Sequence, residues 1–225
     1  FRRVLFRSVV DTSRGVGGDY SAFTVIDITE TPYKVVAKFR DNLITPMLYP
    51  TMIHTVARNY NNAYVLVEIN DNGQQVADIL HHELEYENIL WVNRDGTKGQ
   101  VVSGGFGGRT TQPGVRTDKK VKRVGCSQLK TLVEGQRLLI WDRDIISEFS
   151  TFVEKKDSYA ADEGYHDDLV MPLVLFGWLT TNPYFRELTN VNLRENMYEN
   201  QIRQIEDELT PFGFIDNGVE EQQPE

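Results

Sequence analysis

Apolar and polar positions in the first sixty residues predict strands first and a helix afterwards. A short apolar run ends at Val10, and β-branched and aromatic residues fill the segments 22–29 and 33–39. Pro32 stands between these two segments, so we predict a hairpin there and a three-stranded meander with the first run. Residues 47–60 then carry apolar residues at helical spacing, which predicts the first helix.

The rest of the patterned chain alternates between strand and helix. Residues 63–70 are almost continuously apolar, which is typical of a strand buried on both faces. The later patterns predict a helix over 73–84, a strand over 89–93, a helix from 119 that ends at Gly135, a strand over 137–142, a helix or a helix with an edge over 144–155, and an apolar helix over 168–181. We therefore predict an α/β fold, a mixed sheet with helices on both faces.

Two stretches lack the pattern of packed structure. Residues 96–117 contain seven glycines, which predicts a mobile glycine-rich loop. Beyond residue 182 the chain has the pattern of a polar helix and then an acidic end that we expect to be disordered. The expected organisation is one domain over 1–182, followed by the polar helix and acidic tail over 183–225.

Charge is distributed unevenly along the chain. The net charge is −9, but residues 195–225 alone hold nine acidic residues and one basic residue, and the remainder is close to neutral. Between 109 and 130 the single acid is Asp118, against the basic residues Arg109, Arg116, Lys119, Lys120, Lys122, Arg123 and Lys130. Such a local patch can bind a polyanion whatever the total charge. The alternative is an ordinary solvated surface segment.

Three absences narrow the class of protein. Cys126 is the single cysteine, so no internal disulfide can form, which fits a reducing compartment. No window holds eighteen consecutive apolar residues, so we expect no membrane span and no membrane partner. The nucleotide-binding pattern G-x-x-x-x-G-K-[ST] does not occur.

Carboxylates stand at the ends of three apolar elements. Asp11 ends the first strand, Glu68 lies at the end of a later one, and Asp167 and Asp168 begin the apolar helix. Each alone has an ordinary explanation as a turn residue, an ion-pair partner or a helix cap. Brought to one point, however, like charges need a cation. Oxygen ligands select a hard ion such as Mg²⁺ or Mn²⁺, and two such ions about 3.5–4 Å apart clamp the oxygens of a phosphoryl transfer.

Four segments resemble the nuclease domain of the large terminase subunit of T-even-like tailed bacteriophages. They are "DTSRGVGGDYSAF" at 11–23, "YVLVEIN" at 64–70, "VGCSQLKTLVE" at 124–134 and "EGYHDDLVMPLVLFGWL" at 163–179. The resemblance runs over roughly residues 9–182. It implies a ribonuclease-H-like fold and a metal-dependent endonuclease that cuts concatemeric viral DNA during genome packaging.

The resemblance also implies which acids hold the metal. In this family the metal-binding and catalytic triad falls on the positions of Asp11, Glu68 and Asp168. Asp19 and Asp167 would be further or alternative ligands. Two ions, Mg²⁺ or Mn²⁺, would be held in the active complex, with Asp11 bridging them and Glu68 and Asp168 holding one each.

Two further sets of residues would contact the DNA. Gly15, Gly17 and Gly18 would let the first loop approach a phosphate without a Cβ clash. The DNA backbone would lie along the basic residues Arg116, Lys119, Lys120, Lys122, Arg123 and Lys130. Because phosphate contacts carry no base information, cleavage should depend little on sequence.

The setting implied by the resemblance is a packaging motor. Such a nuclease is joined to a packaging ATPase domain in the same full-length chain, with the portal protein and the small terminase subunit as partners. It would work in the host cytoplasm, transiently docked on the viral prohead. The family has a histidine in the segment that corresponds to 41–50, where this chain has Pro46 and no histidine before His54. His166 is then the candidate histidine near the site.

Two other functions stay open. A Holliday-junction resolvase or transposase-type nuclease would use the same carboxylates, but it would need a dimer or a longer chain. An actin-like ATP-binding module would use the loop 11–19 to cradle a phosphate, but it would need a second phosphate loop and a duplicated domain. A non-catalytic DNA-binding module would leave Asp11, Glu68 and Asp168 unexplained.

Overall fold

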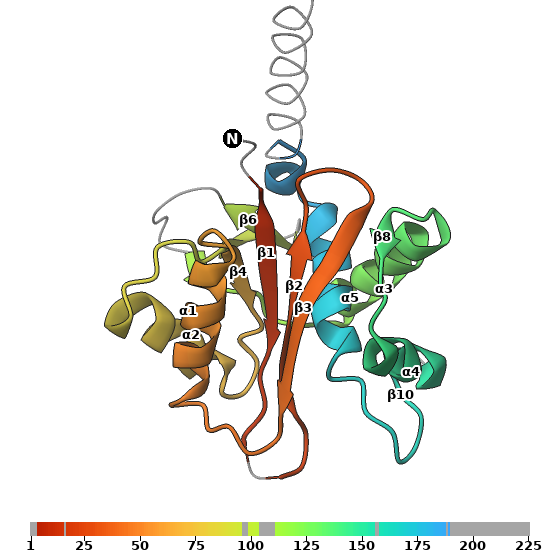
Figure 1. Ribbon diagram of the computed structural model, residues 1–225, viewed down its shortest axis with the longest axis horizontal. Coiled ribbons are helices and arrows are strands. Elements are labelled where there is room, and N and C mark those ends of the chain that lie inside the picture. Colours follow the sequence, from red (N-terminus) through yellow and green to blue (C-terminus); the bar gives the residue numbers. More distant parts are fainter. Residues whose placement is uncertain are drawn as a thin grey trace, which may run out of the picture.

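A five-stranded mixed sheet forms the centre of the computed structural model, which describes residues 4–15, 17–95, 99–103, 111–155, 158–187 and 189 (Figure 1). The strand order is β4-β1-β2-β3-β8. The strands are β1 (Phe6–Asp11), β2 (Ser21–Asp27), β3 (Tyr33–Asp41), β4 (Tyr64–Val67) and β8 (Leu138–Leu139). Neighbours β1, β2 and β3 are antiparallel, whereas β4 runs parallel to β1 and β8 parallel to β3. The predicted meander and mixed sheet are confirmed.

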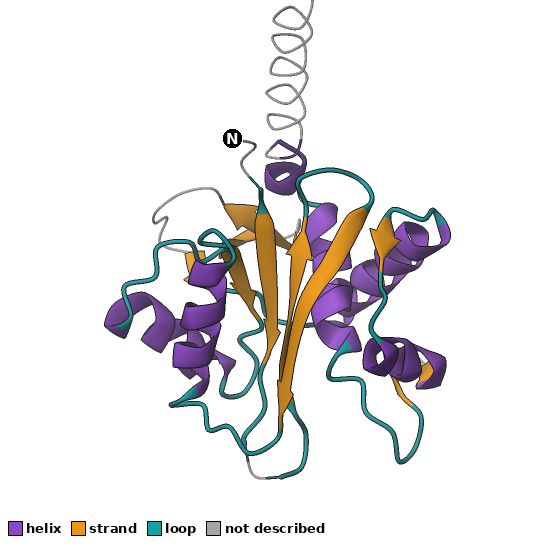
Figure 2. Ribbon diagram, viewed as in Figure 1, coloured by secondary structure: helices purple, strands orange, loops and turns teal. Residues whose placement is uncertain are grey.

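Helices cover both faces of this sheet (Figure 2). On one side lie α1 (Tyr49–Asn59), α2 (Gly73–Asp78) and the π-helical turn η1 (Ile79–Glu83), and on the other lie α3 (Lys119–Glu134), α4 (Arg143–Thr151) and α5 (Val170–Thr180). Successive side chains of β1 point to opposite faces of the sheet, so Val9 packs in the core beneath α5 and Val10 packs in the core beneath α1.

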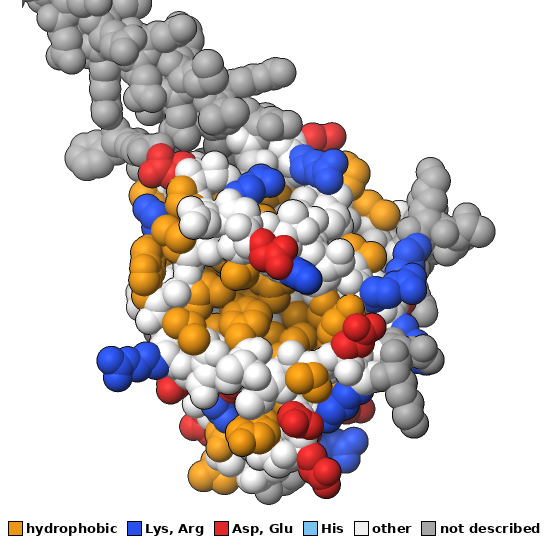
Figure 3. Space-filling model, turned by 90° about the vertical axis from the view of Figure 1, so that its right-hand side faces the viewer, with side chains coloured by type: hydrophobic (Ala, Val, Ile, Leu, Met, Phe, Trp, Pro, Cys, Tyr) orange, Lys and Arg blue, Asp and Glu red, His pale blue; other side chains and the backbone are white. Residues whose placement is uncertain are grey.

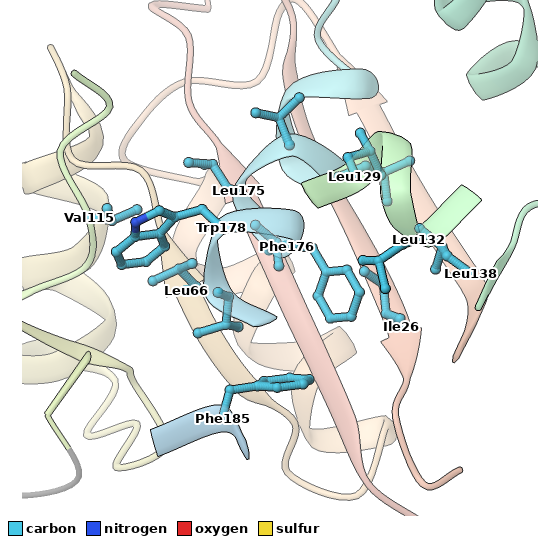
Figure 4. Close-up of a cluster of buried hydrophobic side chains, with 14 of the residues drawn as sticks. Ile26, Leu66, Val115, Leu129, Leu132, Leu138, Leu175, Phe176, Trp178 and Phe185 are labelled. Carbon is cyan, nitrogen blue, oxygen red and sulfur yellow. The ribbon is translucent and has the colours of Figure 1, made fainter. Parts of the chain in front are cut away.

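The larger core lies between the sheet, α5 and α3 (Figure 4). Every residue of α5 is buried, because the helix has the sheet on one side and α3 on the other. The two helices touch at glycines. A Cβ on Gly125 would lie 2.3 Å from the Val174 carbonyl oxygen, and one on Gly177 would lie 2.6 Å from the Gly125 carbonyl oxygen. This close crossing holds α5 against α3, and the acids just before α5 are positioned with the helix.

The glycine-rich stretch differs from the prediction of an unpatterned loop over 96–117. Strands β6 (Gly99–Ser103) and β7 (Thr111–Pro113) both pair antiparallel with β5 (Trp91–Asp95), in the order β6-β5-β7. The prediction is wrong for these pairing residues, because strands of three to five residues carry too few side chains to show a period of two and are held by backbone pairing with β5. Residues 96–98 and 104–110 lie outside the described residues.

The outer edge of β4 is joined to this second sheet. Bridges connect Val65 to Ile89 and Glu68 to Val115, and the Val115 amide donates to the Val67 carbonyl oxygen at 2.8 Å. The residues of β4 after Tyr64 are fully buried, as predicted for a strand covered on both faces. Glu68 therefore stands where two sheets meet.

Other boundaries are shorter or different from the predicted ones. The helix predicted over 144–155 ends at Thr151, and the chain continues as the hairpin β9 (Phe152–Lys155) and β10 (Ser158–Ala161). The core continues past the expected domain boundary at residue 182, since the buried Phe185 ring packs against Tyr33 and Phe176. Of the polar helix and acidic tail predicted over 183–225, residue 188 and residues 190–225 lie outside the described residues.

One side of the molecule presents an apolar hollow (Figure 3). This side carries β8, α3 and α4, and exposed large hydrophobic residues on or beside these elements are Val133, Trp141 and Ile146. Among the described residues, no helix is both long enough and apolar enough to cross a membrane.

Candidate metal centre

Asp11 and Glu68 end two parallel neighbouring strands. The register pairs Val10 with Val67, and the Glu68 amide donates to the Val10 carbonyl oxygen at 2.9 Å. Two residues earlier, Val9 and Leu66 belong to the core on the α5 side of the sheet. Side chains alternate along a strand, so both carboxylates also face the α5 side. Glu68 is largely buried, with 7% of its surface exposed.

Asp168 joins them from the residues just before α5. The Tyr20 amide, at the start of β2, donates to Asp168 Oδ1 at 3.3 Å. This hydrogen bond links the loop after β1 to the N-terminal end of α5. Asp168 is 8% exposed, whereas the neighbouring Asp167 is half-buried. The structure thus places Asp11, at the end of β1, near Glu68 on one side and near Asp168 on the other.

The carboxylates perturb one another. Burial raises the pKa of Asp11 well above its ordinary value, and the nearby acidic groups of Glu68, Asp168 and Asp167 raise it further. Burial also raises the pKa of Asp168, although the Tyr20 amide, His166 and Arg40 act in the opposite direction. Like charges held close in a buried place favour the protonated form unless a cation neutralises them.

The chemistry of this cluster fits a hard divalent cation. Asp168 Oδ2 is buried and accepts no hydrogen bond, and its ion-pair partner is His166 Nδ1 at 3.5 Å. Among the described residues, no three His, Cys, Asp or Glu side chains already stand as a complete set of metal ligands. The acids therefore converge, but their side chains as they stand do not form a finished coordination shell.

A cavity of about 480 Å³ opens beside Asp11 and Asp168, and Glu68 is not among its lining residues. Asp11, Asp167 and Asp168 line one part of it. Asp19, which is exposed, and Arg14 line the loop side. Asp19 thus lies at the same cavity but outside the buried group of acids.

The predicted basic residues lie mainly on α3. Asp118 caps this helix by accepting from the Val121 amide, which explains the single acid of the basic segment. Lys122 comes close to the acids, with Nζ 3.9 Å from Asp167 Oδ2. The remaining predicted DNA contacts are exposed and lie on or just before α3: Arg116, Lys119, Lys120, Arg123 and Lys130. Arg109 lies outside the described residues.

The three predicted loop glycines differ from one another. Gly15 has φ +67°, and a Cβ there would lie 2.3 Å from the Ile44 carbonyl oxygen, so glycine is required. Gly17 also has a positive φ, but the space around it is open. Gly18 lines the cavity and has room for a Cβ. Close approach to a neighbour is therefore seen at Gly15 alone of these three.

Sequence reasoning missed residues that hold Glu68. Asn70 Nδ2 donates to Glu68 Oε1 at 3.0 Å and to the Thr117 carbonyl oxygen at 3.1 Å. Gly73, the first residue of α2, leaves room for the backbone of Glu68, since a Cβ there would lie 1.8 Å from the Glu68 carbonyl oxygen. The sequence did contain a sign of this arrangement, because an asparagine and a glycine follow Glu68 within five residues.

The two histidines considered in the sequence analysis, His166 and His54, lie in different parts of the structure. His166 contacts Asp168 and packs edge-to-face against Tyr20, with ring centroids 5.1 Å apart. His54 instead packs against Tyr86 on the other side of the sheet. His166 is therefore the histidine beside the carboxylates.

Comparisons with known proteins identify the fold. The model of the family described as Terminase RNaseH-like domain matches residues 9–178. The large terminase nuclease from thermophilic phage G20c is similar at 20% identity, covering 77% of this chain and 80% of that one, with TM-scores of 0.57 for its cobalt-bound structure and 0.55 for its magnesium-bound structure. The large terminase nuclease domain of Thermus phage P74-26 is 21% identical over 76% of this chain and 77% of that one, with a TM-score of 0.52. The predicted ribonuclease-H-like fold is confirmed.

Proposed function

The chain belongs to the terminase RNaseH-like domain family, and on that premise we propose that it is a metal-dependent endonuclease that cuts concatemeric viral DNA during genome packaging. The position of Asp11 carries the proposal, because Asp11 lies near both Glu68 and Asp168 and lines an open cavity together with Asp168. The similar large terminase nuclease of phage G20c, whose structures are described with bound cobalt and with bound magnesium, supports it.

Each acid has a distinct place in the proposed reaction. Asp11 lies beside both other acids, so Asp11, Glu68 and Asp168 would together hold the metal ions, with Asp167 and Asp19 as further ligands. Bound Mg²⁺ or Mn²⁺ would supply an activated water and stabilise the charge on the leaving 3′ oxygen. The protein's own part is orientation: Asn70 holds Glu68, and the Tyr20 amide holds Asp168.

The DNA backbone lies, in this proposal, along the exposed basic side chains of α3. Lys122 beside Asp167 is the point at which the basic surface reaches the acids. Contacts of this kind bind phosphates and do not read bases, so we propose low sequence specificity. The substrate is double-stranded DNA.

The proposed setting is a packaging motor of a T-even-like phage. In it the nuclease works with a packaging ATPase domain of the same full-length chain, with the portal protein and with the small terminase subunit. We place it in the host cytoplasm, transiently docked on the viral prohead. Membership of the terminase RNaseH-like domain family supports a nuclease of a packaging motor rather than an actin-like ATP-binding module.

Plasmid nicking tests the proposal directly. Supercoiled plasmid incubated with the protein and Mg²⁺ or Mn²⁺ should be nicked and then linearised, and a chelator should stop the reaction. Asp11→Asn should be inactive in the same assay. A four-way junction supplied beside the plasmid separates the resolvase alternative, since preferential cutting of the junction would overturn the packaging role. Electron density from crystals soaked in Mn²⁺ would count the ions bound at the three acids.

A further inference from the structure

We propose that the ion pair between Arg40 and Glu148 is a positioning device that holds Asp168 in place to receive a divalent ion. The pair lies outside the acidic triad and was not among the residues singled out from the sequence. The inference rests on the proposed function, because it concerns how the same site is organised for its metal.

Arg40 stands in the same row of the sheet as the acids. Register pairs Asp11 with Ala22 across β1 and β2, and Ala22 with Arg40 across β2 and β3. Directly paired residues point to the same face, so Arg40 faces the α5 side together with Asp11. The small side chain of Ala22 between them leaves space over the strand, and Asp168 reaches this region through its bond to the Tyr20 amide.

Glu148 connects Arg40 to the residue that follows Asp168. Arg40 Nη1 lies 2.9 Å from Glu148 Oε1, and Glu148 Oε2 accepts from the Leu169 amide at 2.8 Å. Glu148 is 7% exposed and comes from α4. One carboxylate thus joins β3 to the peptide group between Asp168 and Leu169, which fixes the backbone that carries the Asp168 side chain.

Arg40 also contacts Tyr20, the residue whose amide donates to Asp168. Its guanidinium lies over the Tyr20 ring, 3.9 Å from the ring centroid, and the Tyr20 amide is the donor to Asp168 Oδ1. Arg40 therefore acts on both sides of Asp168: it contacts the ring of Tyr20, and it pairs with Glu148, which accepts from the Leu169 amide. Removing it should loosen the side chain and the backbone of Asp168 together.

The same strand offers a matched pair without these contacts. Lys38, two residues before Arg40, pairs with Asp142 at 2.5 Å and also with Asp144, so it ties β3 to the start of the same helix α4. Neither of these acids bonds to the residues around Asp168 in the described structure. Lys38 is therefore a control for the general link between β3 and α4.

Calorimetric titration of Mn²⁺ into the full chain without DNA tests the proposal, because it measures the site independently of cleavage. Arg40→Met and Glu148→Gln should each weaken Mn²⁺ binding about 10–100-fold, the usual effect of losing a group that orients a metal ligand. Arg40→Lys keeps a cation for Glu148 but loses the planar contact with Tyr20, so its affinity should fall between Arg40→Met and the parent protein. Lys38→Met should leave the affinity unchanged even where it lowers the melting temperature.

The possible failures can be told apart. If the parent protein binds Mn²⁺ and Arg40→Met, Glu148→Gln and Arg40→Lys bind it equally well, the positioning role is wrong and the proposed function stands. An equal loss of affinity in Lys38→Met would also overturn the positioning role, since the effect would then belong to the docking of α4. If the parent protein binds no Mn²⁺ and Asp11→Asn behaves identically, both proposals fall. Arg40→Lys serves as the second variant if Arg40→Met does not fold.

Discussion

The carboxylate of Asp11 lies beside that of Glu68 because β1 and β4 run parallel and end at the same level, with the Glu68 amide bonded to the Val10 carbonyl oxygen at 2.9 Å. Backbone pairing therefore holds two acids together that would otherwise repel each other. Burial has the larger effect on the pKa of Asp11 and raises it, and the nearby carboxylate of Glu68 raises it further. The fold thus maintains an electrostatically unfavourable pair, and a cation is the group that would relieve it.

Replacing Asp11 with asparagine should abolish plasmid nicking in Mg²⁺ or Mn²⁺ while leaving the fold intact. The metal-free variant should melt at the same or a higher temperature, because one of the repelling charges is removed. Nicking assays beside thermal melts in chelator measure both effects. Nicking by Asp11→Asn at the parent rate would remove this residue from the site.

The two adjacent acids before α5 should differ in importance. Asp168 is buried and bonded to the Tyr20 amide, whereas Asp167 is half-buried and pairs with Lys122 at 3.9 Å. We expect Asp167→Ala to retain more nicking activity than Asp168→Ala. Initial rates at saturating Mn²⁺ check this order, and the reverse order would mean that Asp167 holds the metal.

The stability of the metal-free protein should depend on pH through Asp11. Its pKa is raised in the folded state, so its contribution to stability is fully present below the ordinary aspartate pKa of about 4 and is lost as pH rises through the folded-state value. Between about pH 4 and pH 8 in chelator, the melting temperature of the parent protein should fall relative to that of Asp11→Asn. Saturating Mn²⁺ should cancel the difference. A parent protein that gains stability over Asp11→Asn as pH rises would contradict this assignment.

Neutralising the start of α3 should weaken DNA binding for all sequences alike. The fourfold change Lys119→Gln, Lys120→Gln, Lys122→Gln and Arg123→Gln should flatten the plot of log affinity against log salt, because each phosphate contact contributes about −0.9 to its slope on duplex DNA. Fluorescence anisotropy with a labelled duplex at several salt concentrations measures that slope.

Lys34→Gln is the control for this experiment. Lys34 pairs with Asp27 in the register between β2 and β3, at the end of the sheet away from the acids. It should leave the slope unchanged. If the fourfold variant binds DNA with the parent slope, the basic segment is a solvated surface and Arg14, which lines the cavity, is the next residue to test.

Gly73→Ala should displace Glu68, although Gly73 is not itself one of the candidate metal ligands. The new Cβ would stand 1.8 Å from the Glu68 carbonyl oxygen, so the backbone of Glu68 must move. We expect a loss of about 1–3 kcal/mol in the free energy of unfolding, typical of overpacking, together with weaker nicking. Gly18→Ala, where nothing lies within 4 Å of the new Cβ, should keep the parent stability in the same denaturant titrations.

The sequence alone predicted the meander, the buried strand at residues 63–70 and the helices on both faces. These elements were predictable because burial imposes a period on each of them, of two in strands and 3.6 in helices. Asp11, Glu68 and Asp168 were noticeable for the same reason, as charged groups at the ends of apolar elements. The roles assigned to them came from resemblance to a family and remain predictions.

The surroundings of these acids could not be predicted, because they depend on contacts between distant segments. The glycine contact between α3 and α5, and the contact of Arg40 with Glu148, join segments that lie far apart in the chain, and β7 pairs with β5 across the whole glycine-rich stretch. Such contacts leave no local period, because they depend on register and on the close fit of two surfaces. The order of residues therefore shows which acids stand at the ends of strands and helices. The packing of α4 and α5 against the sheet brings Asp168 near Asp11 and sets Glu148 beside Arg40.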